Sequence, residues 1–292
     1  MFGRGSIAMG LAATVTLVSL VGCTLRIGET DVFRPPSLEA REDIALRKES
    51  ELVAEFGATV SHETREFGGI PIALTRAAPQ GLAPDAPLLV SCSGNASDRY
   101  STGTTYAAKL LPFGEAVLFD YPGYGDSGGE ATVADIEAMA DDFIAWVEAE
   151  AGERPLVFWG HSLGGFVCSD LAKRSQSVDM VVLETTARNV SEVAKAWKPW
   201  WAPVRLRTDE DLARFDTADA LADFMGPVVV IGAKHDEVLP VELHRSLARA
   251  LPSPFASYIE IADANHFSAG FSPKAVAKIE ASLAALERAG KS

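Results

Sequence analysis

The fold is decided by the stretch Gly160-His161-Ser162-Leu163-Gly164-Gly165. It follows an apolar run, Leu156 to Trp159, and precedes a helix-like run, Phe166 to Lys173. A strand, a sharp turn with a central serine and then a helix form the context in which G-x-S-x-G is a nucleophile elbow. The alternative is a glycine-rich turn of the kind found between any strand and helix.

The chemistry of an elbow explains each residue type in this stretch. A serine at the tip of the turn sits in strained backbone geometry, which persists only when its surroundings enforce it. Gly160 and Gly164 lack the Cβ atoms that would collide where strand and helix approach. The turn would expose the Ser162 hydroxyl and place the Leu163 amide, at the positive end of the helix, beside an oxyanion formed there.

An elbow implies function only if an acid and a histidine follow it in that order, each just beyond a strand. Asp236 lies in Gly232-Ala233-Lys234-His235-Asp236, directly after the apolar run that starts at Val228. His266 lies in Ile261-Ala262-Asp263-Ala264-Asn265-His266-Phe267, directly after the last apolar run. The order of Ser162, Asp236 and His266 therefore passes this test.

Other residues compete for these roles. Glu184 also ends a strand and is an alternative acid, but the loop of Asp236 follows the strand before the histidine strand. Asp120, Asp126 and Ser127 are interpreted as loop scaffolding rather than catalysts. None of the remaining histidines has the required position. His62 is on an early strand and His161 precedes the serine. His235 is next to the acid and His244 is inside a helix.

Strands and helices alternate along the rest of the chain. Two strands joined at Gly68-Gly69 form a predicted hairpin. Short apolar runs follow, of the kind buried on both faces of a parallel sheet. They include 87–92, 116–120, 156–159, 180–184, 228–232 and 256–261. A helix is predicted over 132–151, with Thr132 and Asp135 as a capping box, and a last helix begins at Ser272-Pro273. The alternation predicts a mostly parallel sheet with helices on both faces.

Taken together, the elbow, the two loops and this alternation resemble the α/β-hydrolase superfamily. The phrases Asp120-Tyr121-x-Gly-Tyr124-Gly-x-Ser127 and Asp236-Glu237-x-x-Pro240 resemble its lipase, esterase and serine-peptidase-like branch. The resemblance covers about Thr59 to Leu286 and implies an eight-stranded sheet. We expect a hydrolase domain over 57–290, with a small inserted lid over 189–225.

The resemblance implies a role for each site residue. Ser162 would attack a carbonyl, His266 would take and return the proton, and Asp236 would fix the imidazole tautomer. One oxyanion donor would be the Leu163 amide. The other would come from the loop after the third strand, where the family's His-Gly-x is replaced by Ser93-Gly94-Asn95. The Asn95 amide is the candidate, with Ala96 next. No metal or cofactor is expected.

Composition bounds the partners. The chain has 292 residues, 48% of them hydrophobic, which suffices for a substantial core. Its formal net charge is −14. This acidity argues against nucleic-acid binding through phosphates, and no basic patch for anionic lipid headgroups is expected.

The N-terminus predicts export. Residues 1–22 carry Arg4 and an apolar stretch, Ile7 to Val21, that is short for a transmembrane helix. Leu20-Val21-Gly22-Cys23 resembles a bacterial lipobox, which implies a lipoprotein signal peptide and lipidation of Cys23. A plain signal peptide or a buried helix is the alternative. The hypothesis is a membrane-anchored envelope lipoprotein, with the final membrane left open. Residues 23–56 are predicted to be a tether and arm without visible chemistry.

Two features have ordinary structural interpretations. Cys92 and Cys168 are expected to be small apolar core residues, although an exported protein can form disulfides. The cluster Trp197 to Trp201 could line an acyl pocket or face a membrane, but such aromatics commonly pack a lid onto its domain.

The sequence thus predicts a serine hydrolase that cleaves carboxylic esters, possibly lipid or acyl esters, through an acyl-enzyme. Peptide-bond cleavage and acyl transfer use the same triad and stay open as alternatives. A further alternative from another class is a catalytically inactive member that acts as an envelope-binding lipoprotein. The substrate and the oligomeric state cannot be read from the chain.

Overall fold

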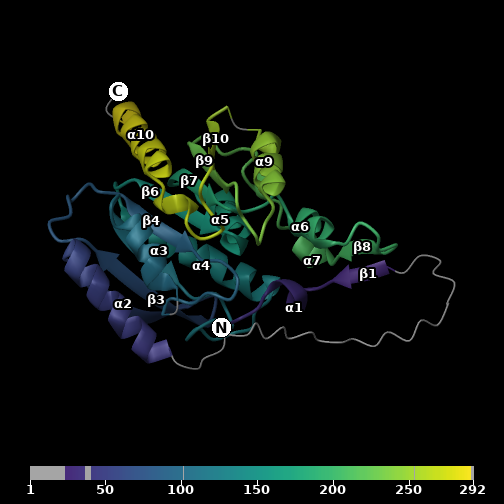
Figure 1. Ribbon diagram of the computed structural model, residues 1–292. Helices are drawn as coiled ribbons and strands as arrows, with labels where there is room; N and C mark the ends of the chain where they lie inside the picture. The colour runs from purple at the N-terminus through teal and green to yellow at the C-terminus, as the bar shows by residue number, and fades with distance from the viewer. Residues whose placement is uncertain (1–23, 37–40, 101, 253, 291–292) are drawn as a thin grey trace, which may run out of the picture.

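An eight-stranded sheet runs through the molecule in the order β10-β9-β7-β6-β4-β5-β3-β2. The computed structural model describes residues 24–36, 41–100, 102–252 and 254–290 (Figure 1). β2 pairs antiparallel with β3, and β3 antiparallel with β5, whereas all other neighbours are parallel. The predicted mostly parallel eight-stranded sheet is confirmed. Its strands are β2 (Thr59–Phe67), β3 (Ile70–Ala78), β4 (Leu88–Cys92), β5 (Glu115–Phe119), β6 (Leu156–His161), β7 (Val178–Glu184), β9 (Val228–Ala233) and β10 (Ala256–Ile261).

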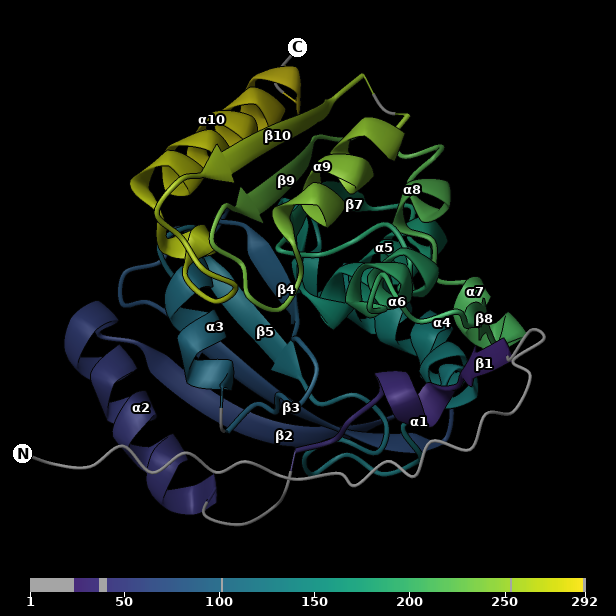
Figure 2. The ribbon, with the colours of Figure 1, turned by 45° about the vertical axis from the view of Figure 1, so that its right-hand side comes forward.

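Helices cover both faces of this sheet (Figure 2). One core contains Val228 and Val230 of β9, and the other contains Val229 and Ile231, as the two-residue period of a strand requires. The first core is closed by α4 (Val133–Ala151), α5 (Leu163–Arg174) and α9 (Val241–Ala250). The second is closed by α2 (Arg41–Phe56), α3 (Gly103–Leu110) and α10 (Pro273–Gly290). A short 3₁₀ helix, η1 (Ala269–Phe271), precedes α10.

Helix α4 shows how local sequence produces these layers. The Thr132 side chain accepts a hydrogen bond from the Asp135 amide and caps the helix. The Asp135 carboxylate accepts instead from the Glu130 amide, so only half of the predicted capping box forms. Ile136, Met139, Phe143 and Val147 are fully buried at helical spacing.

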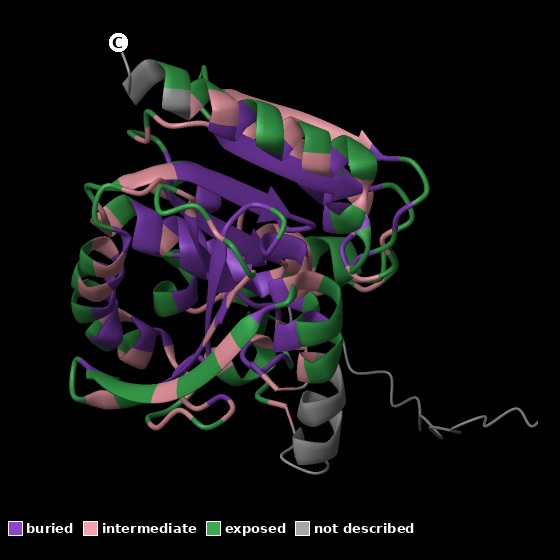
Figure 3. Cartoon of the chain, turned by 90° about the vertical axis from the view of Figure 1, so that its left-hand side faces the viewer, coloured by how far each residue is buried: buried purple, intermediate pink, exposed green. Residues whose placement is uncertain are grey.

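The burial pattern distinguishes the middle of the sheet from its edges (Figure 3). Every residue of β4, β5, β6 and β9 is buried, whereas the edge strands β2 and β10 are largely half-buried or exposed. The strands that carry the elbow and the acid loop are therefore among the most enclosed in the molecule.

A second, two-stranded sheet lies beside this core and was not predicted. β1 (Thr24–Ile27) pairs in parallel with β8 (Arg205–Thr208). Thr24 is the register partner of Arg205, which lies 181 residues further along the chain. The sequence of 189–224 has no apolar run that indicates a strand, yet the structure contains β8 within it. Its short strand has a distant partner, so local periodicity could not reveal it. Near it lie α1 (Glu29–Val32), α6 (Val190–Trp197) and α7 (Glu210–Ala213), whereas α8 (Thr217–Ala220) packs against α5 and α9.

The two internal cysteines are joined. Cys92 ends β4 and Cys168 lies in α5, which packs on that strand, with 5.7 Å between their Cα atoms. This separation is ordinary for a disulfide, and the structure contains one. The interpretation as free core residues is wrong about their bonding, although both side chains are fully buried.

The N-terminal predictions fall mostly outside the described residues. These include the signal peptide over 1–22 and the lipidation of Cys23. Within the described ranges, no helix combines the length and the apolar character needed to cross a bilayer.

Candidate active site

The elbow joins β6 to α5 and has the geometry that its sequence predicts. Ser162 has φ 54° and ψ −119°, a left-handed conformation that is strained for a serine. A Cβ at Gly160 would lie 2.5 Å from the Gly164 carbonyl oxygen, and one at Gly164 would overlap the carbonyl of Cys92. These glycines are therefore required for the close approach of helix and strand.

The loop after β9 meets the loop after β10. Nδ1 of His266 lies 2.7 Å from Oδ2 of Asp236, and both side chains are almost completely buried. Oδ1 of Asp236 accepts hydrogen bonds from the amides of Val238 and Leu239 at 2.8 and 2.7 Å. The carboxylate is thus held by its own loop and directed at the imidazole.

Burial is the largest influence on the Asp236 carboxyl and works against ionisation. Hydrogen bonds from neighbouring groups outweigh it, and the pKa of Asp236 is held well below its usual range. The carboxylate is therefore ionised at neutral pH, as a group that orients an imidazole must be.

His244 of α9 is a neighbour of this carboxylate that the sequence interpretation set aside. Its side chain is fully buried, and its Nε2 lies 3.4 Å from Oδ2 of Asp236. The geometry is a close contact rather than a good hydrogen bond, because both of its ring nitrogens lack a hydrogen-bond partner among the described residues. The signal was available, since His244 shares the inward face of α9 with Leu243 and Leu247.

His161 supports the histidine loop from behind. Its Nε2 lies 2.9 Å from the carbonyl oxygen of His266, which can only accept, so this nitrogen carries the proton. Its Nδ1 then accepts from the Tyr106 hydroxyl at 2.8 Å. Burial lowers the pKa of His161 to about 3, so the ring stays neutral. The rings of His161 and His266 are 4.8 Å apart between centroids.

The two halves of the site are connected by the segment after β7. The Thr186 hydroxyl donates to the Ser162 carbonyl at 2.6 Å, and the Thr185 hydroxyl donates to the His266 carbonyl at 2.9 Å. Within the described residues no hydrogen bond joins the Ser162 hydroxyl to His266. Such bonds are commonly long in unliganded enzymes. The structure brings Asp236 and His266 into direct contact, and the neighbouring residues Thr185 and Thr186 link the backbone of His266 to that of Ser162.

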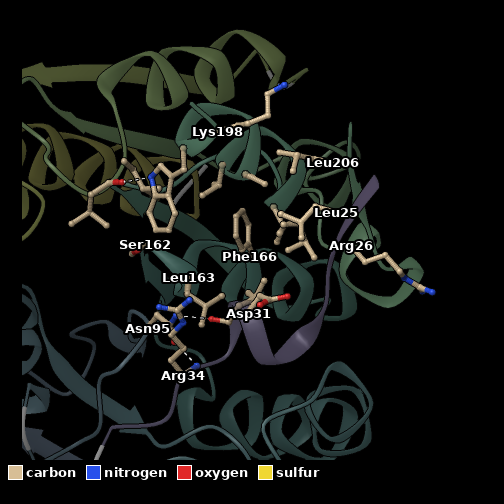
Figure 4. A pocket seen from close by; sticks show the side chains of 18 of the residues that line it. Leu25, Arg26, Asp31, Arg34, Asn95, Ser162, Leu163, Phe166, Lys198 and Leu206 are labelled. Atoms are coloured by element: carbon tan, nitrogen blue, oxygen red, sulfur yellow. Dashed lines mark hydrogen bonds between the residues drawn. The ribbon is translucent and has the colours of Figure 1, made fainter. Parts of the chain in front are cut away.

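The predicted oxyanion donors both border one cavity with Ser162 (Figure 4). Leu163 is the first residue of α5, so its amide has no intrahelical acceptor. The Ala96 amide donates to Oδ1 of Asn95 at 3.1 Å and is engaged, which leaves the Asn95 amide as the better candidate. The Asn95 side chain also accepts from the Arg34 amide and the Tyr124 hydroxyl, both at 2.9 Å.

The competing carboxylates are used elsewhere. Glu184 binds Nζ of Lys109 at 2.7 Å, Nε1 of Trp159 at 2.9 Å and the Gly270 amide at 2.8 Å. Despite complete burial, these partners keep the pKa of Glu184 below its usual range. Asp120 accepts from the amides of Arg99 and Asp126 at 2.7 and 3.1 Å, so it holds two loops together, as the scaffolding interpretation expects.

The cavity beside Ser162 has a volume of about 500 Å³ and mostly apolar walls. One wall belongs to α5 and the acid loop, and the other to residues 24–34 together with α6, β8 and the segment between them, which we call the cover. Its lining residues from the cover include Leu25, Ile27, Val32, Val193, Ala194 and Leu206. The N-terminal arm, predicted only to be a tether without visible chemistry, builds part of this wall. No local sequence pattern marks such a role.

Residues 29–33 attach the N-terminal arm to the sheet domain, next to the residues that line the cavity. Phe33 is buried in the core, the Val133 amide donates to Glu29 Oε1 at 2.6 Å, and Nδ2 of Asn95 donates to the Val32 carbonyl at 2.5 Å. The loop that carries an oxyanion candidate is therefore bonded directly to the cover.

The tryptophans of the insertion do not pack it onto the domain. Trp200 is 94% exposed and Trp201 68% exposed, so that interpretation is wrong for both. Trp197 borders the cavity and donates from Nε1 to the carbonyl of Val238, in the acid loop, at 2.8 Å.

Within the described part of the chain, no group of three or more His, Cys, Asp or Glu side chains is arranged to hold a metal ion.

Comparisons with known proteins agree with this geometry. Residues 115–220 match the family model described as alpha/beta hydrolase fold. Among solved structures, the esterase Pf2001 of Pyrococcus furiosus aligns with a TM-score of 0.61 at 15% identity, covering 86% of this chain and 97% of that one. Est1E of Butyrivibrio proteoclasticus aligns with a TM-score of 0.58 at 15% identity, over 77% and 98%.

The chain has the α/β-hydrolase fold. Its curated relatives include the lysophosphatidylserine lipase ABHD12 of Rattus norvegicus, 29% identical over 57% of this chain and 46% of the relative. An uncharacterized protein of Mycobacterium tuberculosis is 29% identical over 62% of this chain and 63% of its own length. The matches therefore span less than two thirds of these relatives. The α/β-hydrolase fold and esterase- and lipase-like relatives are what these comparisons share.

Proposed function

We propose that this protein is a serine hydrolase that cleaves carboxylic esters of apolar acyl chains through an acyl-enzyme. One arrangement carries the proposal: the loop of the buried Asp236–His266 pair is linked to the elbow of Ser162 through Thr185 and Thr186, and Ser162 borders an apolar cavity. Such a cavity can enclose an acyl chain, and the residues of both oxyanion candidates, Asn95 and Leu163, border it with Ser162.

In the first step, Ser162 Oγ attacks the ester carbonyl carbon. Because Nδ1 of His266 is engaged by Asp236, Nε2 is the nitrogen left to take the serine proton. The carbonyl oxygen becomes an oxyanion, which the amides of Leu163 and Asn95 would stabilise. Collapse of the tetrahedral intermediate expels the alcohol, which receives the proton from His266 and leaves the acyl group on the serine.

In the second step, water replaces the alcohol. His266 takes a proton from the water as it attacks the acyl-enzyme, and the same two amides receive the second oxyanion. Ser162 leaves as its alcohol and the carboxylic acid is released. The ionised Asp236 stabilises the imidazolium in both steps, which is consistent with its depressed pKa.

The walls of the cavity support a lipid ester as the substrate. Apolar side chains from four separate parts of the chain line it, and most of the lining surface is apolar. Relatives named lysophosphatidylserine lipase point to the same class, a lipid ester.

The proposed location is the cell envelope, with export by residues 1–22 and a lipid anchor at Cys23. The Cys92–Cys168 disulfide supports export, because such bonds persist in oxidising compartments and are rare in the cytosol of most cells. Residues 57–290 would be the catalytic domain, with 189–225 as its lid.

A chain-length series of acyl esters tests the function. We expect kcat/KM to rise with acyl length in the wild type and turnover to vanish in Ser162→Ala. Ala194→Phe should fill the cavity and lower kcat/KM for long chains roughly tenfold or more, while the acetyl ester is nearly unaffected. Ala196→Phe is the matched control, because Ala196 lies on the same helix, is exposed and does not line the cavity.

Two outcomes would contradict the proposal. Turnover that persists in Ser162→Ala would remove the serine mechanism. Absence of ester turnover, together with cleavage of matched acyl anilides that Ser162→Ala abolishes, would replace the ester substrate by an amide.

A further inference from the structure

The cover exposes large aromatic and basic side chains that the proposed reaction does not use. Trp200 and Trp201 lie between α6 and β8 and are 94% and 68% exposed. Neither lines the cavity, in contrast to Trp197 and Lys198 just before them. Two neighbouring tryptophans this exposed are uncommon on a surface that faces water, because their large apolar rings remain hydrated there.

The charge of this segment is opposite to that of the whole chain. Lys195 to Arg207 contains four basic residues and no acidic one, in a protein of net charge −14. In the two-stranded sheet, Arg26 of β1 is in register with Arg207 of β8, and Arg205 is also exposed. Neighbouring arginines on paired strands repel each other, and among the described residues Arg26 alone of these three has an acidic partner, Asp209 at 2.8 Å. The net charge of the chain does not reveal this local basic segment.

Tryptophans with interspersed cations are the composition of a protein surface at the membrane interface. The indole ring favours the headgroup level of a bilayer, and arginine and lysine are attracted by anionic lipid there. We propose that Arg26, Trp200, Trp201, Arg205 and Arg207, the interfacial patch, dock the cover onto an anionic bilayer surface.

The position of the N-terminus supports a bilayer over other partners. Cys23 is bonded directly to Thr24, the first residue of β1, and Thr24 is paired with Arg205. If Cys23 is the lipid anchor, the acyl chains would begin one residue from the patch. The contact with the bilayer would then have two parts, a covalent anchor and a protein surface beside it, as stable attachment commonly requires.

Docking there would connect the bilayer to the cavity. Leu25 is 55% exposed and Trp197 58% exposed, and both border the cavity that opens at Ser162. A lipid ester could then pass from the bilayer to the cavity past apolar side chains, without its acyl chain crossing water. The patch therefore adds a route for substrate to the proposed function, but its binding does not depend on catalysis.

Tryptophan fluorescence tests the docking. The full chain carrying Ser162→Ala is reconstituted into vesicles whose lipids bear brominated acyl chains, which quench indoles on contact. We expect quenching that increases when phosphatidylglycerol replaces part of the phosphatidylcholine. It should be largely lost in Trp200→Ala/Trp201→Ala and retained in Trp146→Phe, because Trp146 lies half-buried on α4 in the sheet domain. Arg205→Gln/Arg207→Gln should remove the response to anionic lipid.

A second measurement separates this docking from the catalytic proposal. In the active protein, Trp200→Ala/Trp201→Ala should lower turnover of a long-chain ester held in vesicles about tenfold and leave turnover of a water-soluble short-chain ester unchanged. Fluorescence that is not quenched would overturn the docking even if hydrolysis is observed. Chemical crosslinking of copies through the patch, lost in the tryptophan variant, would instead assign it to self-association and also overturn the proposal.

Discussion

The sheet domain and the cover contribute to one site in different ways. The sheet domain supplies the elbow, the Asp236–His266 pair and the segment Thr185-Thr186 that fixes both, and nearly all of these groups are buried. The cover supplies half of the apolar cavity wall, from short elements that are half-buried or exposed. The reacting groups are thus held by a dense core, while the substrate would be enclosed by a thin layer with few buried residues.

This difference predicts which substitutions affect the reaction, which affect stability and which affect only the choice of substrate. Buried groups in the sheet domain should show large effects because their partners cannot be replaced by water. Groups in the cover should show small effects on folding and larger ones on long-chain substrates.

The largest effect should come from the reacting groups. Ser162→Ala should lower kcat by about 10⁴-fold or more, and adding His266→Ala should lower it little further, because triad residues act as a unit. Ester hydrolysis by the single and double variants measures both. A large further loss in the double variant would mean that the two residues contribute independently.

Ion pairs in the two regions should differ in how much they contribute to the free energy of unfolding. Lys109→Met leaves Glu184 charged and fully buried, and should lower the free energy of unfolding by about 3–5 kcal/mol. In the cover, Arg26→Met removes the exposed partner of Asp209 and should cost less than about 1 kcal/mol. Urea denaturation measures both, and equal losses would contradict the distinction between core and cover.

The disulfide should contribute somewhat less. Replacing Cys92 and Cys168 together by alanine should lower the free energy of unfolding by about 2–4 kcal/mol, because the bond closes a long loop within the sheet domain. Reducing the wild type should lower its melting temperature, whereas reductant should leave the double variant unchanged. A double variant as stable as the wild type would show that the bond does not constrain the unfolded chain.

The smallest effect concerns acid pH. Because the folded pKa of Asp236 is lowered, its contribution is present above the unfolded value of about 4 and is lost as pH falls below that value. The free energy of unfolding should therefore fall less steeply between pH 5 and pH 2 in Asp236→Asn than in the wild type. Denaturation at a series of pH values measures the two slopes, and identical slopes would mean that the carboxyl is not stabilised in its ionised form.

The sequence was sufficient for the sheet domain because its signals are local. Continuous apolar runs predicted the buried strands, and the glycines around Ser162 predicted a close contact that the structure contains. The cover could not be predicted in the same way. β1 and β8 are four residues long and far apart in the chain, so nothing near either one indicates its partner. The disulfide was missed for the same reason, since it depends on how α5 packs against β4.

The net charge of the whole chain also conceals local differences in charge. The net charge of the chain gave no indication of the basic segment from Lys195 to Arg207, because acidic residues elsewhere outnumber it. His244 was set aside for its place inside a helix, although the buried face of that helix points at Asp236. The basic segment can be predicted from the charge of short segments, and the placement of His244 from the apolar face of its helix.

Covalent labelling tests the central claim most directly. A fluorophosphonate with a long alkyl chain reacts only with an activated serine, and tandem mass spectrometry locates the adduct. We expect one adduct, on Ser162, that forms far more slowly in His266→Ala and is suppressed by a long-chain acyl ester. Labelling at another residue, or none in the folded wild type, would contradict the assignment of Ser162 as the nucleophile.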